Sequence, residues 1–155
     1  MPSFETSDFY PQPLERVFDF FRRPANLTRA APAELNLEVV EAPEVLEVGS
    51  RVVVQVRRWG FTQRIATAVT ALQPNAVLVQ EQCEGPFHKW MQSQRFQAVP
   101  ESGTEVTFTI DYEPPGGMLG MFLTAAKIEE DLGRLSEYRA RMTKKVLEHP
   151  DPREP

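Results

Sequence analysis

The sequence predicts an α+β protein in which a curved antiparallel sheet of about seven strands packs against one long C-terminal helix. Prolines and glycines divide the first two thirds of the chain into short segments, several of which alternate apolar and polar residues, as half-buried strands do. The segment after Pro13 has apolar residues at helical spacing. The last third of the chain changes to a period of three to four residues, which is typical of a helix.

The first part of the chain is expected to form one strand and two short helices. Ser3–Tyr10 alternates and predicts the strand. Leu14–Phe21 has apolar residues every three to four positions behind a proline in the favoured first-turn position, which predicts a helix. Ala25–Ala31 is expected to form the second short helix.

Six further strands are expected because each of the following segments is bounded by Gly, Pro or Asn. In chain order they are Leu35–Val40, Arg51–Trp59, Phe61–Leu72, Ala76–Glu84, His88–Val99 and Glu105–Glu113. For Ala76–Glu84 the pattern leaves two possible inward faces. One carries Val77, Val79, Glu81 and Cys83, and the other carries Leu78, Gln80, Gln82 and Glu84.

A helix is expected from about Met118 to Glu148. At 1.5 Å per residue it would be on the order of 45 Å long, which exceeds the ~30 Å diameter of a domain of this size. The helix must therefore cross the whole sheet. A sheet curved around such a helix has two ends that side chains rarely fill, so we expect a cavity between helix and sheet. A coiled-coil strand is the alternative, which Gly133 and the lack of e/g charge pairing disfavour.

Length and composition indicate one domain, expected over residues 1–149, with residues 150–155 as a disordered tail. The net charge of −5 disfavours nucleic-acid binding, which needs Lys and Arg against phosphates. No apolar run approaches the ~18 residues of a membrane span, and the N-terminus lacks the features of a secretory leader. The single Cys83 excludes an internal disulfide and suits a reducing compartment. We expect a cytoplasmic protein that is a monomer or a weak homodimer.

Three short motifs accompany this order of segments. Gly85–Trp90 reads Gly-Pro-Phe-His-Lys-Trp, Tyr112–Gly117 reads Tyr-Glu-Pro-Pro-Gly-Gly, and Tyr138 precedes Arg139. With the opening helices, they resemble the bacterial polyketide cyclase/dehydrase-like branch of the SRPBCC (START-like) superfamily. The resemblance covers nearly the whole chain. It implies the helix-grip fold and a pocket for a hydrophobic small molecule such as a lipid, an isoprenoid or an aromatic metabolite.

The chain departs from this branch at three positions of the inner face that the resemblance implies. Histidines commonly occupy the positions of Gln92 and Gln94 in the branch, and an acid occupies that of Phe108. The two amides and the aromatic ring carry no titratable group, which argues against an inherited acid/base role at these positions.

The expected ligand-binding residues combine apolar surface with a few polar groups. They are Trp90, Gln92, Gln94, Phe96, Phe108 and Tyr112. Two inward glutamines need partners, because an unpaired buried amide costs roughly 1–3 kcal/mol. We expect them to bond each other, water or a ligand. The alternative is that they pair across strands and that side chains fill the space.

The sequence offers few groups for catalysis or metal binding. Glu81 and Tyr112 are the weak catalytic candidates, since a carboxyl on an inward face would have a raised pKa. An exposed or salt-bridged Glu81 is the alternative. Cys83, His88 and His149 do not supply the three or four converging ligands of a zinc site, so no metal or other cofactor is expected. Cys83 is expected to have a packing role and His88 to lie at the surface.

Three functions remain open from the sequence. The leading hypothesis is a binding or carrier domain for a hydrophobic small molecule, with an entrance between Pro114–Gly117, the end of the long helix and the loops near Pro43 and Gly60. A cyclase/dehydratase-type enzyme using the same cavity is the second, and it would need a positioned acid or base. The third is a protein-interaction module that acts through an apolar patch at Met118–Phe122.

Overall fold

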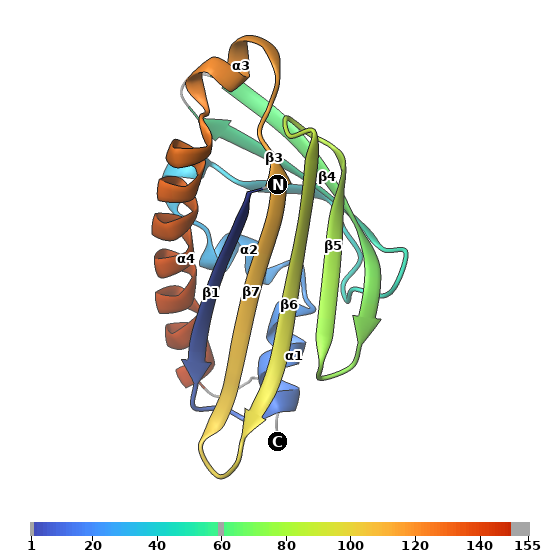
Figure 1. Ribbon diagram of the computed structural model, residues 1–155. Coiled ribbons are helices and arrows are strands. Elements are labelled where there is room, and N and C mark those ends of the chain that lie inside the picture. Colours follow the sequence, from blue (N-terminus) through green and yellow to red (C-terminus); the bar gives the residue numbers. More distant parts are fainter. Residues whose placement is uncertain (1, 59–60, 150–155) are drawn as a thin grey trace.

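The computed structural model describes residues 2–58 and 61–149. They form a seven-stranded antiparallel sheet in the order β1-β7-β6-β5-β4-β3-β2 (Figure 1). The strands are β1 (Ser3–Tyr10), β2 (Glu38–Glu41), β3 (Arg51–Arg58), β4 (Phe61–Gln73), β5 (Val77–Glu84), β6 (Lys89–Val99) and β7 (Gly103–Glu113). The first strand therefore pairs with the last one at one edge of the sheet, and β2 forms the other edge.

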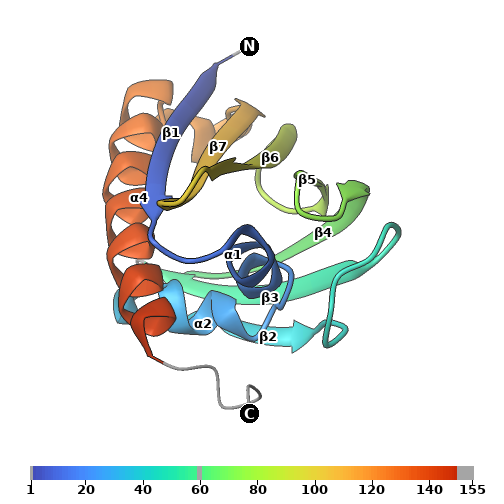
Figure 2. The ribbon, with the colours of Figure 1, turned by 90° about the horizontal axis from the view of Figure 1, so that it is seen from below.

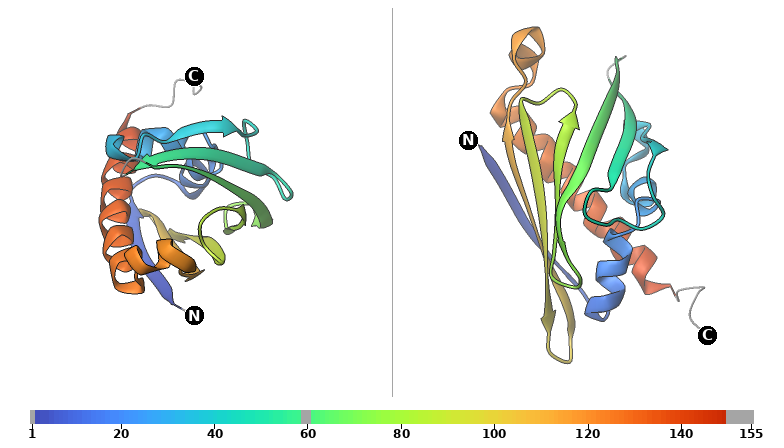
Figure 3. Two further views of the ribbon diagram at one scale, coloured as in Figure 1. Left: turned by 90° about the horizontal axis from the view of Figure 1, so that it is seen from above. Right: turned by 90° about the vertical axis from the view of Figure 1, so that its right-hand side faces the viewer.

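The helices lie between β1 and β2 and after β7. They are α1 (Leu14–Phe21), α2 (Asn26–Ala30), the 3-10 turn η1 (Ala33–Leu35), α3 (Gly117–Phe122) and α4 (Ala125–Glu148). The sheet is strongly curved, with α4 along its open side and α1 inside the curve at one end (Figures 2 and 3). The predicted α+β arrangement of seven strands, two short helices after the first strand and a long C-terminal helix is confirmed.

The strand expected at Leu35–Val40 differs most from the structure. Its first residue ends η1, and the strand begins only at Glu38. Asn36 follows η1 with a φ of 47° in the left-handed region, which no strand residue adopts. Trp59, the expected end of the next strand, lies outside the described residues.

The C-terminal helix is shorter than predicted because it is interrupted between Phe122 and Ala125. Thr124 is extended there, and its Oγ1 accepts a hydrogen bond of 3.3 Å from the backbone N–H of Lys127. This is a helix N-cap, so a new helix starts at this point. The 24 residues of α4 span about 36 Å and still run along the sheet.

Burial decides which side of each strand faces α1 and α4. On β7 every second side chain is buried, from Thr104 to Tyr112. On β5, Leu78 and Gln80 are buried, whereas Glu81 and Cys83 are exposed. The inward face of β5 is therefore the one with Leu78 and Gln80. The expected packing role of Cys83 is wrong, because its thiol is exposed.

The buried side chains form two apolar clusters. One surrounds α1 and joins Val17 and Phe18 to Phe96 of β6 and Leu147 of α4. The other lies between β7 and the first half of α4 and includes Phe108, Ile110, Tyr112, Ile128 and Leu132. The second cluster holds α4 against the sheet, which places the middle of this helix opposite α2.

Candidate functional site

The residues predicted to bind a ligand lie on the inner side of β6 and β7, but several of them are packed against other side chains. Phe96 contacts Phe18 edge to face, with ring centroids 4.9 Å apart, and Phe21 at 5.8 Å. Trp90 and Tyr112 form an aromatic cluster with Phe87, with ring centroids 4.7 to 6.2 Å apart. These rings belong to the core of the protein.

A row of polar side chains crosses three neighbouring strands. Trp90 Nε1 donates to Gln92 Oε1 at 3.1 Å, and Gln92 Nε2 donates to Gln80 Oε1 at 3.0 Å. Gln80 Nε2 in turn donates to Thr67 Oγ1 at 3.4 Å. Gln92 thus pairs across strands, as the alternative prediction had it. Sequence reasoning did not select Gln80, since it depended on the undecided inner face of β5.

Gln94 differs from Gln92. Its side chain is 5% exposed and lies opposite Phe108 in the register of β6 and β7. Its amide makes no hydrogen bond to another side chain or backbone group within the described ranges. In those ranges the fully enclosed side-chain atoms without a partner are Gln12 Oε1 and Thr143 Oγ1, so the Gln94 amide borders open space. It is available to a ligand or to water.

The structure does not bring the two catalytic candidates together. Glu81 is exposed on the outer side of β5. Tyr112 is buried, and its hydroxyl donates to the backbone carbonyl of Ala125 at 3.4 Å. Burial, and to a lesser extent the Glu129 carboxylate, raises the pKa of Tyr112. A phenol that is neutral and already donating to a helix end is a poor general base.

A cavity of about 170 Å³ lies between α1, α2, η1 and α4. Its lining is largely apolar and includes Phe20, Phe21, Leu27, Ala30, Leu35 and Leu135. The Pro114–Gly117 turn, where the sequence predicted the entrance, is not part of this cavity. Gly60, which was expected near the same entrance, lies outside the described residues.

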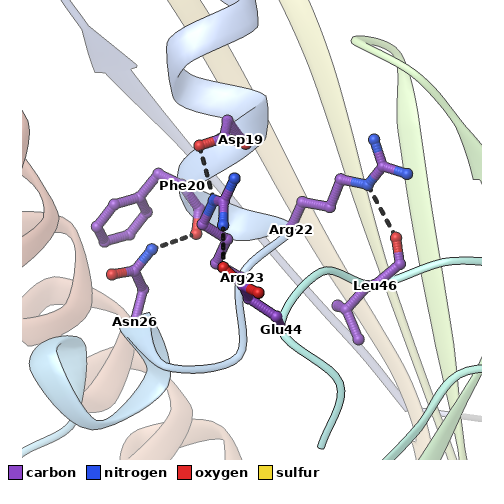
Figure 4. Close-up of polar contacts among 7 residues, drawn as sticks. All are labelled: Asp19, Phe20, Arg22, Arg23, Asn26, Glu44 and Leu46. Atoms are coloured by element: carbon purple, nitrogen blue, oxygen red, sulfur yellow. Dashed lines mark hydrogen bonds and ion pairs between the residues drawn. The ribbon is translucent and has the colours of Figure 1, made fainter. Parts of the chain in front are cut away.

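Polar contacts hold the corner between α1 and α2 that forms one wall of the cavity (Figure 4). Asn26 Nδ2 donates to the carbonyl of Phe20 at 2.7 Å, at the end of α1. Arg23 pairs with Asp19 at 2.9 Å and with Glu44 at 3.5 Å. Because these contacts join α1, α2 and the loop before β3, the corner is fixed by more than its apolar packing.

The opposite wall is formed by the middle of α4 and by η1. An ion pair of 3.1 Å between Arg134 and Glu34 joins these two elements. Both side chains are about half exposed, so the pair stabilises the protein by at most about 1 kcal/mol. Its main effect is to define where η1 lies relative to α4.

Arg139 is a functional candidate that sequence reasoning did not select. It lines the cavity, and its guanidinium carbon lies 3.9 Å from the centroid of the Phe108 ring. The cation therefore lies over the ring, within the range of a cation–π contact. Burial lowers the pKa of Arg139, whereas Tyr10 and Asp8 act in the opposite direction. A charged side chain that is largely surrounded by apolar neighbours is unusual and indicates a specific role.

The sequence did contain a signal for Arg139. The residue follows Leu135 by four positions and Leu132 by seven, which places it within the apolar stripe of α4. A charged residue inside such a stripe is directed toward the core. The prediction of α4 used only the apolar members of the stripe and therefore missed it.

The inner side of β1 contributes two titratable groups near Arg139. Burial raises the pKa of Asp8, against the lowering effect of the charges of Arg139 and Lys144. Burial also raises the pKa of Tyr10, which is 1% exposed. The Asp8 carboxylate acts on Arg139 through space, because no ion pair within 4.0 Å joins these two described residues.

Within residues 2–58 and 61–149, no three His, Cys, Asp or Glu side chains converge in a way that could hold a metal ion. No helix within the same ranges has the length and apolar character needed to cross a membrane.

Comparisons with solved structures extend over almost the whole chain. The Zhui aromatase/cyclase from Streptomyces sp. R1128 superposes with a TM-score of 0.72 at 17% identity, over 95% of this chain and 93% of that one. A START superfamily protein from Mycobacterium smegmatis gives a TM-score of 0.72 at 14% identity, over 94% and 97%. At these identities the likeness establishes the fold.

Sequence comparisons identify relatives and a family. An uncharacterized protein of Mycobacterium tuberculosis is 33% identical, over 66% of this chain and 48% of the relative. The chain spans about half the length of the curated relatives that it matches. The family model described as "Polyketide cyclase / dehydrase and lipid transport" matches residues 10–134. The chain therefore belongs to this family, whose model matches most of its length.

Proposed function

We propose that this chain is a binding or carrier domain for a hydrophobic small molecule, which it holds in the cavity beside α2. The observation that supports this most directly is the largely apolar hollow of about 170 Å³ between α1, α2, η1 and α4. The family description, which includes lipid transport, agrees with this proposal. The driving force is the burial of apolar ligand surface, roughly 25 cal/mol per Å².

The size of the cavity bounds the ligand. An enclosed cavity of ~150 Å³ in another protein holds one benzene molecule, whereas pockets for drug-sized ligands measure roughly 300–1,000 Å³. A hollow of about 170 Å³ therefore suits one aromatic ring or a short alkyl chain. Among the ligand classes considered, a small aromatic metabolite fits within the hollow, whereas a long lipid would extend beyond it.

The proposal is tested by filling the cavity. Leu135→Trp adds a large ring to the cavity wall and is expected to abolish binding of toluene, measured by ligand-observed NMR. Glu137→Trp is the matched control, because Glu137 is exposed on the same helix. It is expected to bind toluene as the wild type does. If the wild-type protein retains no toluene or indole at millimolar concentration, or if Leu135→Trp still binds them, the proposal is wrong.

A cyclase/dehydratase-type enzyme is the second candidate function. It is favoured by the family description and by the likeness to a structure named as an aromatase/cyclase. The described inner sides of β5, β6 and β7 supply amides and aromatic rings, and the hydroxyl of Tyr112 is engaged by Ala125. The chemistry would then have to use Asp8, the carboxyl of β1 whose pKa burial raises. We rank this candidate below binding alone, because Glu81 is on the outer side of the sheet.

A protein-interaction module is the third candidate. It is favoured by α3, on which Met118 is 77% exposed, Met121 78% and Phe122 70%. A single exposed apolar side chain is common on protein surfaces, but three on one short helix form an apolar patch. We propose that this patch permits no more than weak self-association, so the protein is a monomer or a weak homodimer.

We also propose a cytoplasmic location. The thiol of Cys83 is free and exposed, and an exposed free thiol is stable in a reducing compartment. Alkylation of Cys83 in intact cells by a membrane-permeant reagent, but not by an impermeant one, would support this location.

A further inference from the structure

We infer that the cavity binds a small monocarboxylic acid, and that Arg139 holds the carboxylate of this ligand. The inference rests on the proposed binding function and goes beyond it by naming the ligand class. The apolar part of the acid occupies the hollow beside α2, and its carboxylate meets the guanidinium in the wall formed by α4.

The hydrogen-bond donors of Arg139 have no partner in the part of the chain that the structure describes. The guanidinium carbon lies over the Phe108 ring, 3.9 Å from its centroid. A guanidinium carries five N–H donors in its plane. Within the described ranges they form no hydrogen bond and no ion pair, and none of the nitrogens is fully enclosed. The donor edge is therefore open to a planar acceptor, and a carboxylate is the acceptor that matches it with two parallel bonds.

The other polar groups of the cavity wall are already engaged. Arg23 also lines the cavity, but Asp19 and Glu44 compensate its charge. Asn26 donates its amide to the end of α1. Of the described cations that line the cavity, Arg139 is therefore the one without a direct counter-charge. Since a poorly solvated charge without a partner is costly, an anionic ligand group relieves that cost when it binds.

The surroundings of Phe108 support the same assignment. Gln94, opposite Phe108 in the sheet, also has an amide without a described partner. A guanidinium and an amide therefore border the same ring, and both are donors. The chain as a whole carries a net charge of −5, so long-range attraction does not bring an anion here. Selection for a carboxylate must come from the contact with Arg139 itself.

The inference is tested with a matched pair of probes, 3-phenylpropanoate and its uncharged analogue 3-phenylpropanamide. Wild-type protein is expected to bind the acid about ten- to a hundred-fold more tightly than the amide, measured by calorimetric titration. Arg139→Gln is expected to lower the affinity for the acid to that for the amide and to leave the amide unchanged. Arg141→Gln is the matched control: Arg141 lies on the same helix and over the Tyr138 ring, but it is exposed.

The outcomes separate this inference from the proposed function. If neither probe binds the wild type, the binding function fails. If both bind equally, or if Arg139→Gln keeps the preference for the acid, the carboxylate inference fails and the binding function stands.

A second variant keeps the test decisive if Arg139→Gln does not fold. Asp8→Asn removes the carboxylate that acts on Arg139 through space. It is expected to raise the affinity for the acid several-fold and to leave that for the amide unchanged, because the anion that competes for Arg139 is gone. A weaker affinity for the acid in Asp8→Asn would contradict the inference.

Discussion

At the scale of single residues, the inner side of β1 and the middle of α4 form an electrostatic group within an apolar interior. Asp8, Tyr10 and Arg139 are all at least partly buried, and desolvation by burial is the largest cause of the pKa shift of each. The charges of Asp8 and Arg139 partly offset each other's desolvation. No direct ion pair joins Asp8 and Arg139 in the described residues, and the proposed carboxylate ligand would supply the missing counter-charge of Arg139.

Asp8 gives the stability of the protein a defined pH dependence. Its folded-state pKa is raised above the ordinary value of 3.8, so the folded state favours the protonated carboxyl. The contribution of Asp8 to the unfolding free energy is therefore highest below its ordinary pKa and is lost as pH rises through the raised one. Asp8→Asn is expected to remove this loss and to raise the unfolding free energy near pH 7 by less than about 1 kcal/mol, since Asp8 is only half buried.

Urea unfolding of the wild type and of Asp8→Asn between pH 3 and pH 7 checks this prediction. Asp111→Asn is a suitable control, because Asp111 lies on β7 opposite Ser3, away from Asp8, and does not belong to the buried row. A difference between wild type and Asp8→Asn that does not change with pH would contradict the assignment.

At the scale of elements, the local sequence pattern predicted most of the strands and α1. The structure differs from the prediction where two elements meet. The alternation of Ser3–Tyr10 and the spacing of Leu14–Phe21 predicted both bounds of β1 and α1. The continuous helix expected from Met118 was wrong, because the Thr124 cap separates α3 from α4. Since α3 does not continue α4, its side chains do not lie on the stripe that packs against the sheet. Met121, which the expected continuous helix included, is 78% exposed.

The exposed side of α3 has a measurable consequence. We expect weak, concentration-dependent self-association of the wild type in sedimentation velocity, and a loss of this dependence in Met121→Glu. The melting temperature is expected to stay within about 2 °C, because a substitution at an exposed position costs little. Val48→Glu is the control, since Val48 is 64% exposed but lies elsewhere on the surface. Identical sedimentation of the wild type and both variants would remove α3 as an interaction surface.

At the scale of the whole molecule, apolar clusters pack between the sheet and the helices, and the cavity lies among the helical elements. Phe96, Trp90 and Tyr112 pack into the core near α1 and near the start of α4. The hollow lies beside α2 and is lined by residues of α1, α2, η1 and α4. The proposed ligand site is therefore at the helical side of the molecule, away from most of the residues predicted to line it.

The expected domain limits, residues 1–149, lead to a prediction about the whole fold. The carbonyl of His149 accepts a hydrogen bond from Arg16 of α1, which ties the end of α4 to the domain. A chain that ends at His149 is therefore expected to have the same melting temperature as the full chain, within about 2 °C. A chain that ends at Thr143 is the comparison: it loses Leu147, which is 3% exposed, and is expected to be clearly less stable. A large loss of stability in the first truncation would contradict the domain limits.

The sequence by itself determined the class of fold, the order of its elements and the family, because these depend on periodicity and short motifs within single segments. It also determined the inner side of β6 and β7, where Gln94 and Phe108 face inward as expected. Only the tertiary structure decided the inner side of β5, the position of Arg139 over Phe108 and the place of the cavity. Three consecutive elements near the start of the chain and the distant α4 bound that cavity, and the position of α4 relative to the other three depends on long-range packing. A pattern within one segment reports which of its sides is apolar, but not which other segment covers it or leaves it uncovered.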